Sequence, residues 1–234
     1  MKIATVVLLV LLFSYCSINK SYTLIPPGFE YPNSKIKSGK IFTYINSVTR
    51  AKTFENYKLI TVDGRNYLTT KTYNANSTGD SIVSSKGKRI ERYNYFIEEK
   101  NAPIKASILK DTVISYNKEL RKLIIIEEYK TKTLINKVTT EERLLKDTTI
   151  FWKKEFVQCV VILANSRVEF RLNKDSVSFH NIDVTSQLYF GKNIGLIRYS
   201  IHFIDHNGID NFNIWQLESI ENLNNKSLVP VNRK

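Results

Sequence analysis

The histidines are the side chains best suited to chemistry at neutral pH, and two of the three lie beside aspartates. His202 and His206 are four residues apart, with Asp205 and Asp210 next to them, whereas His180 stands alone. Imidazole and carboxylate groups are the usual ligands of zinc. In a strand, however, residues four apart on one face are separated by roughly 13 Å, too far for one zinc ion. We therefore predict no metal site here and place His206 in a turn.

Other catalytic signatures are missing from the sequence. No G-x-S-x-G elbow supports a serine nucleophile, and no glycine-rich loop is suited to phosphate. Cys159 lies in the apolar run 156–162, where a buried and inert thiol is expected. Adjacent acids, such as Glu127 and Glu128, point to opposite faces of a strand and predict exposed charge. We expect no catalytic residue and no cofactor, with an envelope hydrolase as the remotest alternative.

The N-terminus has the features of an export signal. Lys2 precedes an apolar run, residues 3–13, which is followed by Ser14, Tyr15 and Cys16. Residues 3–15 number 13, whereas a membrane-spanning helix needs about 20. The short run therefore indicates export and disfavours an uncleaved anchor.

This segment resembles a bacterial lipoprotein signal, in which the cysteine is lipidated and becomes the mature N-terminus. The resemblance implies lipidation of Cys16, a membrane contact through the lipid anchor, and a place in the cell envelope, at the outer membrane or in the periplasm. Tyr15 stands where such signals have a small residue. Secretion after cleavage behind Cys16 is therefore the alternative. In either case Cys159 has no disulfide partner, so stability must come from a core.

The formal charge of +13 is scattered along the chain rather than gathered in one motif. The densest basic cluster, residues 86–89, has no recognition helix, zinc ligands or RNA-binding aromatic signature beside it. The charge predicts a solvated basic surface and no nucleic-acid partner, and attraction to anionic envelope lipids or polysaccharide stays open.

Proline usage predicts a β-rich body. Only Pro103 and Pro230 follow residue 40, and the intervening sequence is rich in β-branched and aromatic residues. Asp63-Gly64 is the strongest hairpin signal. Residues 74–79 are expected to form a loop and residues 205–208 a turn, while residues 139–145 fit a short capped helix or an extended arm. The expected strands are 41–47, 57–62, 65–73, 89–98, 122–133, 156–163, 167–172, 186–190, 195–204 and 212–219.

One internal repeat relates residues 109–114 to residues 145–150 at a constant offset of 36. In each copy an aspartate, Asp111 or Asp147, precedes threonine and is suited to cap a turn before a strand. The aspartates lack the dense ligand spacing of a calcium loop. We interpret the repeat as a recurring hairpin unit of about 30 to 36 residues.

The C-terminal third resembles the closing region of a group of Bacteroidota envelope lipoproteins. The matching residues are 189–199, an aromatic and glycine-containing strand, and Trp215-Gln216-Leu217. The resemblance implies a lipocalin-like or LolA-like antiparallel fold with a curved, partly open sheet. Gly191 and Gly195 would allow a bulge or close packing at a curved corner, and Trp215 would fill the core.

Together these observations predict an all-β chain, a single antiparallel meander that forms a curved sheet or a partly open barrel. Residues 1–16 are the export signal, 17–40 an extended linker, 41–223 the β domain and 224–234 a C-terminal tail. We expect a non-enzymatic lipoprotein that binds an envelope protein or supports envelope assembly. The alternative is a carrier whose sheet encloses an apolar cavity of several hundred cubic ångströms for a lipid or acyl chain.

Overall fold

The computed structural model describes residues 24–36, 38–74, 78–85, 88–95, 103–115, 121–173, 180–205 and 207–223, and every structural statement below refers to these ranges. A single 3₁₀ turn, η1 (Asn33–Lys35), precedes the strands. The strands are β1 (Lys40–Asn46), β2 (Lys52–Val62), β3 (Arg65–Asn74), β4 (Thr78–Ser85), β5 (Lys88–Tyr95), β6 (Pro103–Lys105), β7 (Ser107–Ser115), β8 (Arg121–Lys130), β9 (Leu134–Trp152), β10 (Glu155–Leu172), β11 (His180–Gly191), β12 (Gly195–Ile204) and β13 (Asp210–Asn222).

All the strands belong to one antiparallel sheet in the order β6-β5-β4-β3-β2-β1-β13-β12-β11-β10-β9-β8-β7. Each strand pairs with its neighbour in sequence, except at one place, and the first strand pairs with the last. The exception is Ala106, where the chain leaves β6 at one edge of the sheet and enters β7 at the other edge. The predicted all-β meander with a curved sheet is confirmed, and the sheet is not closed into a barrel.

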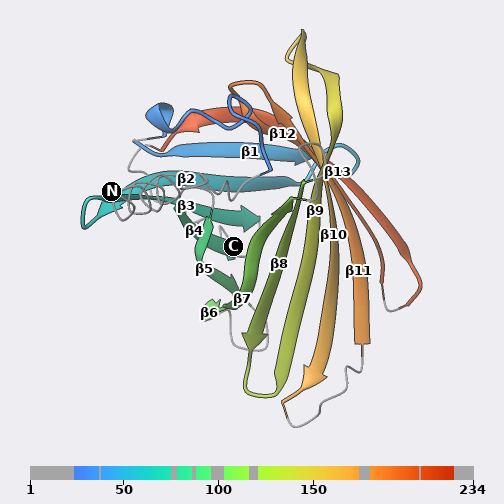
Figure 1. Cartoon of the computed structure of the whole chain (residues 1–234). Coiled ribbons are helices and arrows are strands. Elements are labelled where there is room, and N and C mark those ends of the chain that lie inside the picture. The colour runs from blue at the N-terminus through green and yellow to red at the C-terminus, as the bar shows by residue number, and fades with distance from the viewer. Residues whose placement is uncertain are drawn as a thin grey trace, which may run out of the picture.

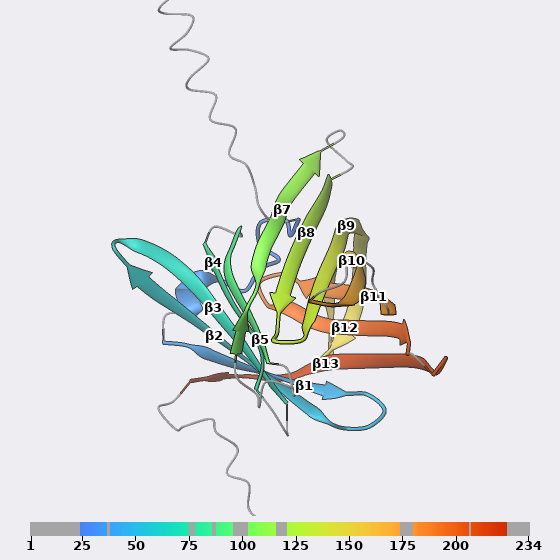
Figure 2. The ribbon, with the colours of Figure 1, turned by 90° about the horizontal axis from the view of Figure 1, so that it is seen from below.

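The sheet is strongly bent. In Figure 1, β1 and β2 run across the direction of β8–β11, which fan out below them. Figure 2, seen from below, shows β2–β5 and β7–β10 diverging as two sides of the bend from β1 and β13. Accumulated right-handed twist between neighbouring strands accounts for such a change of direction. The bend gives the sheet an inner face and an outer face, and on β10 both faces are buried over Cys159–Ile162.

Residues 139–145 do not form the short helix; they are extended, as in the alternative expectation, and lie in the middle of β9. This 19-residue strand is paired on both sides, with β8 and with β10. Thr140, the expected helix cap, faces inward and its hydroxyl lies 2.8 Å from that of Ser166 on β10. Residues 139–143 are paired on both edges, and these backbone hydrogen bonds outweigh a short local capping signal.

Other sequence-based boundaries also need correction. The two strands expected over 156–163 and 167–172 are one continuous strand, β10, and β4 begins at Thr78 inside the expected loop. Asp63-Gly64 does form the predicted two-residue hairpin, with positive φ at both positions. The repeat falls in two consecutive hairpins, β7–β8 and β9–β10. Asp111 and Asp147 lie within β7 and β9, so they do not cap turns as expected.

Within the expected linker, residues 24–36 pack against the sheet, and Lys40 already belongs to β1. Leu24 joins Leu123, Ile125 and Ile162 in a buried cluster, and the backbone N–H of Asn193 donates to the carbonyl of Gly28. Residues 24–36 are therefore not an open spacer, because burial of apolar side chains such as Leu24 opposes their release into water. The domain boundaries at residues 16, 40 and 223 stay predictions.

A second core cluster joins β1 to the C-terminal strands. Phe42, Tyr44, Cys159, Ile197 and Leu217 are all at most 2% exposed. They come from β1, β10, β12 and β13, which meet where the sheet bends. The ring of Tyr31, from the N-terminal segment, packs edge-on against Phe42 at a centroid distance of 5.1 Å.

Gly191 lies beside a β-bulge and packs closely against the core, as the sequence suggested. A β-bulge interrupts the β11–β12 register after Tyr189, and Gly191 pairs with Gly195 across the following turn. A Cβ atom added to Gly191 would lie 2.0 Å from Ile197 Cδ1 and 3.1 Å from Val157 Cγ1. The absence of a side chain at Gly191 therefore makes room for Ile197 in the core.

We expect the Gly191→Ala substitution to lower the free energy of unfolding by about 1–3 kcal/mol, because the new methyl group overpacks the core. Ile197→Val removes the Cδ1 atom and by itself costs about 0.5–1.5 kcal/mol. The loss of unfolding free energy in the double variant should be about 1 kcal/mol smaller than the two single losses added together. Urea unfolding of the four proteins measures this coupling, and strict additivity would show that Gly191 and Ile197 do not compete for space.

Candidate functional site

The most pocket-like hollow of the described chain is a shallow groove on the outer face of β11–β13. It has a volume of about 370 Å³ and is lined by Thr185, Gln187, Ser200, His202, Asp210 and Phe212. Antiparallel register brings these residues together, since His202 pairs with Thr185 on one side and with Phe212 on the other. The alternation of side chains along each strand points all of them to the same face.

His202 and Asp210, two of the residues singled out by sequence, meet in this groove. The Nε2 atom of His202 lies 2.7 Å from Oδ1 of Asp210, and the two side chains are 47% and 71% exposed. Ser200 lies on the same face two residues before His202, but no hydrogen bond joins its hydroxyl to the imidazole in the described structure. The strand N–H groups around Ser200 face neighbouring strands on both sides. The groove therefore lacks free backbone donors for an oxyanion.

The aspartate of the adjacent turn has a structural role. Oδ1 of Asp205 accepts hydrogen bonds from the backbone N–H groups of Asn207 and Ile209, both at 2.9 Å. This is the local carboxylate–backbone bonding that stabilises turns. Within the described ranges, no three His, Cys, Asp or Glu side chains come close enough to hold a metal ion. His206 lies outside the described residues.

The remaining histidine and the described cysteine are both placed away from the groove. His180 begins β11, and its ring lies 5.8 Å from that of Phe170 on β10. Cys159 is fully buried, and burial raises the pKa of its thiol from 9.0 to about 11. A thiol with this pKa is almost entirely protonated at neutral pH, which agrees with the predicted inert cysteine.

Sequence reasoning missed a polar cluster on the inner face, next to the core. The hydroxyl of Tyr57 donates to Oε2 of Glu55 at 2.6 Å, and the hydroxyl of Tyr44 donates to the carbonyl of Leu196 at 3.0 Å. Tyr199 lies against Tyr44 at a centroid distance of 5.5 Å. The alternation of side chains along β2, which puts Glu55 and Tyr57 on one face, was the available sequence signal. Tyr44 and Tyr199 come from β1 and β12, and only the pairing of both strands with β13 brings them together.

Burial changes the protonation of this cluster. It raises the pKa of the Glu55 carboxyl above its usual 4.5, although the hydrogen bond from Tyr57 opposes the rise. Burial and the nearby Glu55 carboxylate also raise the pKa of the Tyr44, Tyr57 and Tyr199 hydroxyls. The tyrosines therefore stay neutral donors over the physiological pH range.

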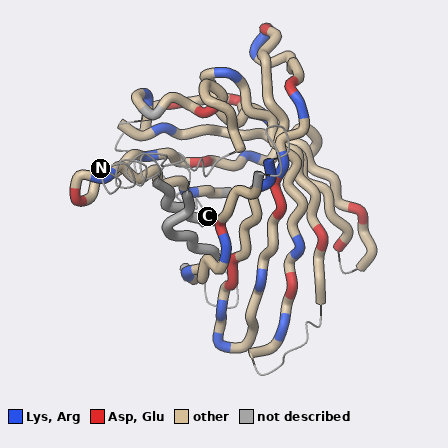
Figure 3. The backbone as a smooth tube through the Cα atoms, viewed as in Figure 1, with Lys and Arg blue, Asp and Glu red and all other residues tan. Residues whose placement is uncertain are grey.

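The outer face of β8–β11 has mixed charge. Figure 3 shows Lys and Arg interspersed with Asp and Glu along these strands. Lys122–Glu141, Lys137–Glu169, Arg171–Glu128 and Arg167–Asp183 form ion pairs between strands, at 2.9, 3.6, 3.1 and 3.2 Å. Exposed pairs of this kind contribute little to stability individually, but they keep the face soluble.

Several predicted features fall outside the described residues. Cys16 lies there, as do residues 86 and 87 of the basic cluster and residues 224–234 of the tail. Among the residues that the structure describes, none belongs to a helix with the length and apolar character needed to cross a membrane.

No protein-family model matches the chain, and no curated protein matches it in sequence. Two crystal structures are similar in fold, a presumed lipoprotein from Parabacteroides distasonis and a presumed exported protein with a YmcC-like fold from Bacteroides fragilis. Each has 10% sequence identity and a TM-score of 0.44; the matches cover 82% and 83% of this chain, and 98% and 99% of those chains. A likeness this remote carries no argument about function, and the descriptions belong to those two proteins.

The Glu55 cluster generates a testable pH dependence. Below pH 4.5 the carboxyl is protonated in both the folded and unfolded states, and its contribution to stability is fully present. This contribution is lost as the pH rises through the raised pKa of the folded state, because the unfolded chain then releases its proton more readily. We expect Glu55→Gln to be more stable than the natural protein at pH 7.5, with the difference disappearing near pH 4.

Urea unfolding at both pH values measures this effect. Glu218→Gln is the matched control, since Glu218 is exposed and pairs with Lys52 on the surface at 2.7 Å. A stability difference for Glu55→Gln that is the same at both pH values would contradict the burial of an ionisable carboxyl.

Proposed function

We propose that this protein is a non-enzymatic cell-envelope lipoprotein, held to the membrane by a lipid on Cys16, whose curved sheet serves as a binding scaffold for an envelope partner. The observation that supports this proposal is the short distance between the lipidation candidate and the folded body. Leu24 is packed into the core cluster, so only residues 17–23 lie between it and Cys16.

The consequence is a limited reach. Eight extended residue steps from Cys16 to Leu24 span at most about 29 Å. Such a connection would keep the sheet next to the bilayer, whereas the 24-residue linker expected from sequence would span up to about 86 Å. A protein held this closely is suited to bind partners at the membrane surface.

The groove does not favour the enzymatic alternative. His202 and Asp210 are exposed, and neither a nucleophile hydrogen-bonded to the imidazole nor a set of oxyanion donors accompanies them in the described structure. The carrier alternative required an enclosed apolar cavity. The groove on the outer face of β11–β13 is open to solvent and lined mainly by polar residues, so it is not a cavity of that kind. A binding scaffold requires neither feature.

Changing Cys16 to Ser tests the anchor. In a bacterium that processes lipoproteins, we expect the natural chain to carry acyl chains by intact mass and to enter the detergent phase on partition. The Cys16→Ser chain should lack the added mass and stay in the aqueous phase. Cys159→Ala removes the other thiol and serves as the control, which should remain acylated. An unmodified natural product that begins at Ser17 would instead establish secretion.

A further inference from the structure

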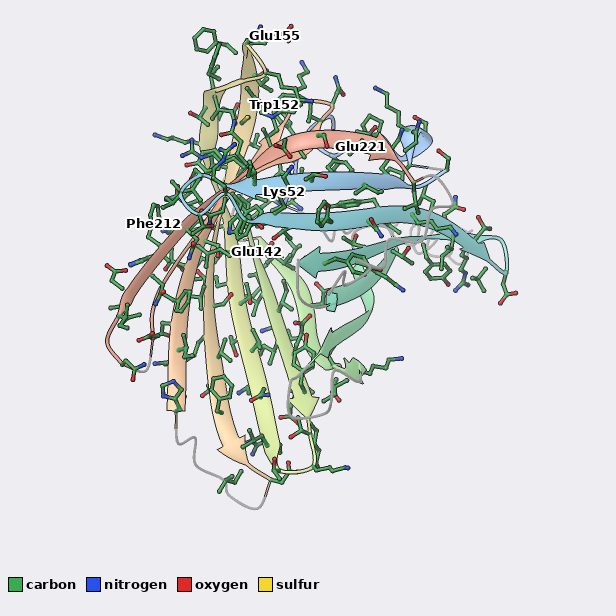
Figure 4. All side chains as sticks on the ribbon, turned by 180° about the vertical axis from the view of Figure 1, so that it is seen from behind. Lys52, Glu142, Trp152, Glu155, Phe212 and Glu221 are labelled. Atoms are coloured by element: carbon green, nitrogen blue, oxygen red, sulfur yellow. The ribbon has the colours of Figure 1, made fainter. Side chains whose placement is uncertain are left out.

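The β9–β10 hairpin projects beyond the rest of the sheet. β9 pairs with β8 only as far as Arg143, and β10 pairs with β11 only from Cys159 onward, so residues 149–158 form strand pairs only with each other. Figure 1 shows this two-stranded extension, in yellow, rising above the other strands. Figure 4 places Trp152 and Glu155 near its top. A free two-stranded ribbon is marginally stable in water, so it must be held by packing or serve a contact.

One face of the extension is fixed to the core. Ile150, Trp152 and Val157 pack against the buried cluster around Leu217. The indole Nε1 of Trp152 donates to the carbonyl of Leu217 at 2.7 Å. The hairpin is therefore held in position relative to the sheet.

The opposite face presents two aromatic rings to solvent. Phe151 and Phe156 pair directly across the strands, with ring centroids 5.3 Å apart, and are 60% and 79% exposed. A cross-strand aromatic pair can stabilise a hairpin by a few tenths of a kcal/mol to about 1 kcal/mol. Stabilising the hairpin, however, does not require the two rings to be this exposed to solvent at the tip of a projecting element. Large apolar side chains that are held out in water indicate a surface that is covered by something else.

The turn between β9 and β10 indicates what kind of surface covers the two aromatic rings. Lys153 and Lys154 both have positive φ, 47° and 71°. Two-residue hairpin turns of this kind favour Asn-Gly or Asp-Gly, as at Asp63-Gly64 in the same sheet. Side chains other than Gly, Asn and Asp are strained in this region of φ. The chain thus accepts backbone strain that places two lysines at the apex, where the Lys153 ammonium lies 4.8 Å from the centroid of the Trp152 ring, on the face opposite the aromatic pair.

We propose that the tip of the β9–β10 hairpin docks into the headgroup region of a lipid bilayer. Phe151 and Phe156 would enter the boundary of the acyl chains, and the ammonium groups of Lys153 and Lys154 would contact lipid phosphates. Aromatic rings combined with lysines are the composition of interfacial membrane contacts. Glu155, the acidic residue of the tip, lies on the same face as Trp152, away from the aromatic pair.

The length of chain before Leu24 allows this contact together with the lipid anchor, and in this respect the inference rests on the proposed function. Leu24 belongs to the cluster around Ile162, which lies six residues along β10 from Phe156. That separation is about 20 Å, whereas Cys16 can reach about 29 Å from Leu24. The acyl chain and the hairpin tip can therefore enter the same bilayer.

A second copy of the chain fits the tip less well. Two tips meeting face to face would bring four lysines together without an added acid on the aromatic face. Two phenylalanines on each side also fall far short of the roughly 1,200–2,000 Å² that stable protein interfaces bury. A bilayer has no such area requirement, and it offers phosphates to every lysine.

Vesicle co-sedimentation of the full-length Cys16→Ser chain tests the proposal without acylation. The probes are phosphatidylcholine vesicles with and without phosphatidylglycerol, at low salt. We expect binding to the mixed vesicles and a loss of about tenfold or more in Phe151→Ser/Phe156→Ser. Leu109→Ser is the matched control, because Leu109 is also 58% exposed but lies on β7, away from the tip (Figure 1). It should bind like the parent.

A second variant separates membrane contact from hairpin stability. Lys153→Asn/Lys154→Gly installs the favoured turn residues, so we expect a higher melting temperature than the parent. The same change should weaken binding to the anionic vesicles roughly 30-fold and leave binding to pure phosphatidylcholine nearly unchanged.

Three results would overturn the proposal: no vesicle binding by the parent, equal binding by the phenylalanine variant, or a concentration-dependent dimer that this variant abolishes. The assay uses unacylated protein, so a failure of Cys16 lipidation leaves its outcome intact. Conversely, normal lipidation together with any of the three results would remove only the hairpin contact and keep the proposed anchor.

Discussion

The pairing of β1 with β13 is the constraint on which the rest of the structure depends. It joins residues as far apart as Lys40 and Asn222, 182 positions along the chain. Without it, the strands before Ala106 and those after it would be two separate meanders, each with an exposed edge. With it, Phe42 and Tyr44 lie opposite Ile220 and Leu217, and the core cluster exists. Such non-local pairing is expected to form late in folding, because closing the long loop costs entropy before any contact offsets it.

The bend of the sheet follows from irregularities in strand pairing close to where β1 meets β13. The register slips by one residue between Thr43 and Tyr44 and again after Tyr189, on strands that meet at the core. Bulges of this kind increase the local twist. Gly191 completes the bend, since a side chain there would occupy the place of Ile197. The partly buried carboxyl of Glu55 lies in the same region and is tolerated because the Tyr57 hydroxyl donates to it.

Much of the fold was predictable, because it depends on local signals. The scarcity of proline and the β-branched composition indicated strands, Asp63-Gly64 marked a hairpin, and Gly191 marked a corner. The predictions that failed concern residues whose structure depends on partners distant in sequence. Thr140 resembles a helix cap until β8 and β10 pair on either side of it, and residues 24–36 resemble a linker until Leu24 meets Ile162.

The candidate sites likewise divide into features predictable from local sequence and features that depend on distant partners. Spacing along one strand argued against a shared metal site, but it could not reveal that antiparallel pairing of β12 with β13 brings the Asp210 carboxylate to the imidazole of His202. The Lys153-Lys154 turn escaped sequence reasoning for a different reason. Its residues are unfavourable for the conformation that they adopt, so propensity predicts against the turn that pairing imposes. Residues that contradict local preference are those for which a function besides folding should be sought.

The two elements that we propose to contact the membrane belong to one rigid arrangement. The N-terminal segment is fixed through Leu24 and Gly28, and the hairpin through Trp152, all to the same bent sheet. A single acyl chain gives only marginal and reversible binding, so a second contact adds both affinity and orientation. His202 lies seven residues along β12 from Gly195, which adjoins the base of the hairpin, and this places the groove about 23 Å from that base. With the tip in the bilayer, the polar groove and the charged outer face of β8–β11 would remain accessible to a partner in the aqueous phase.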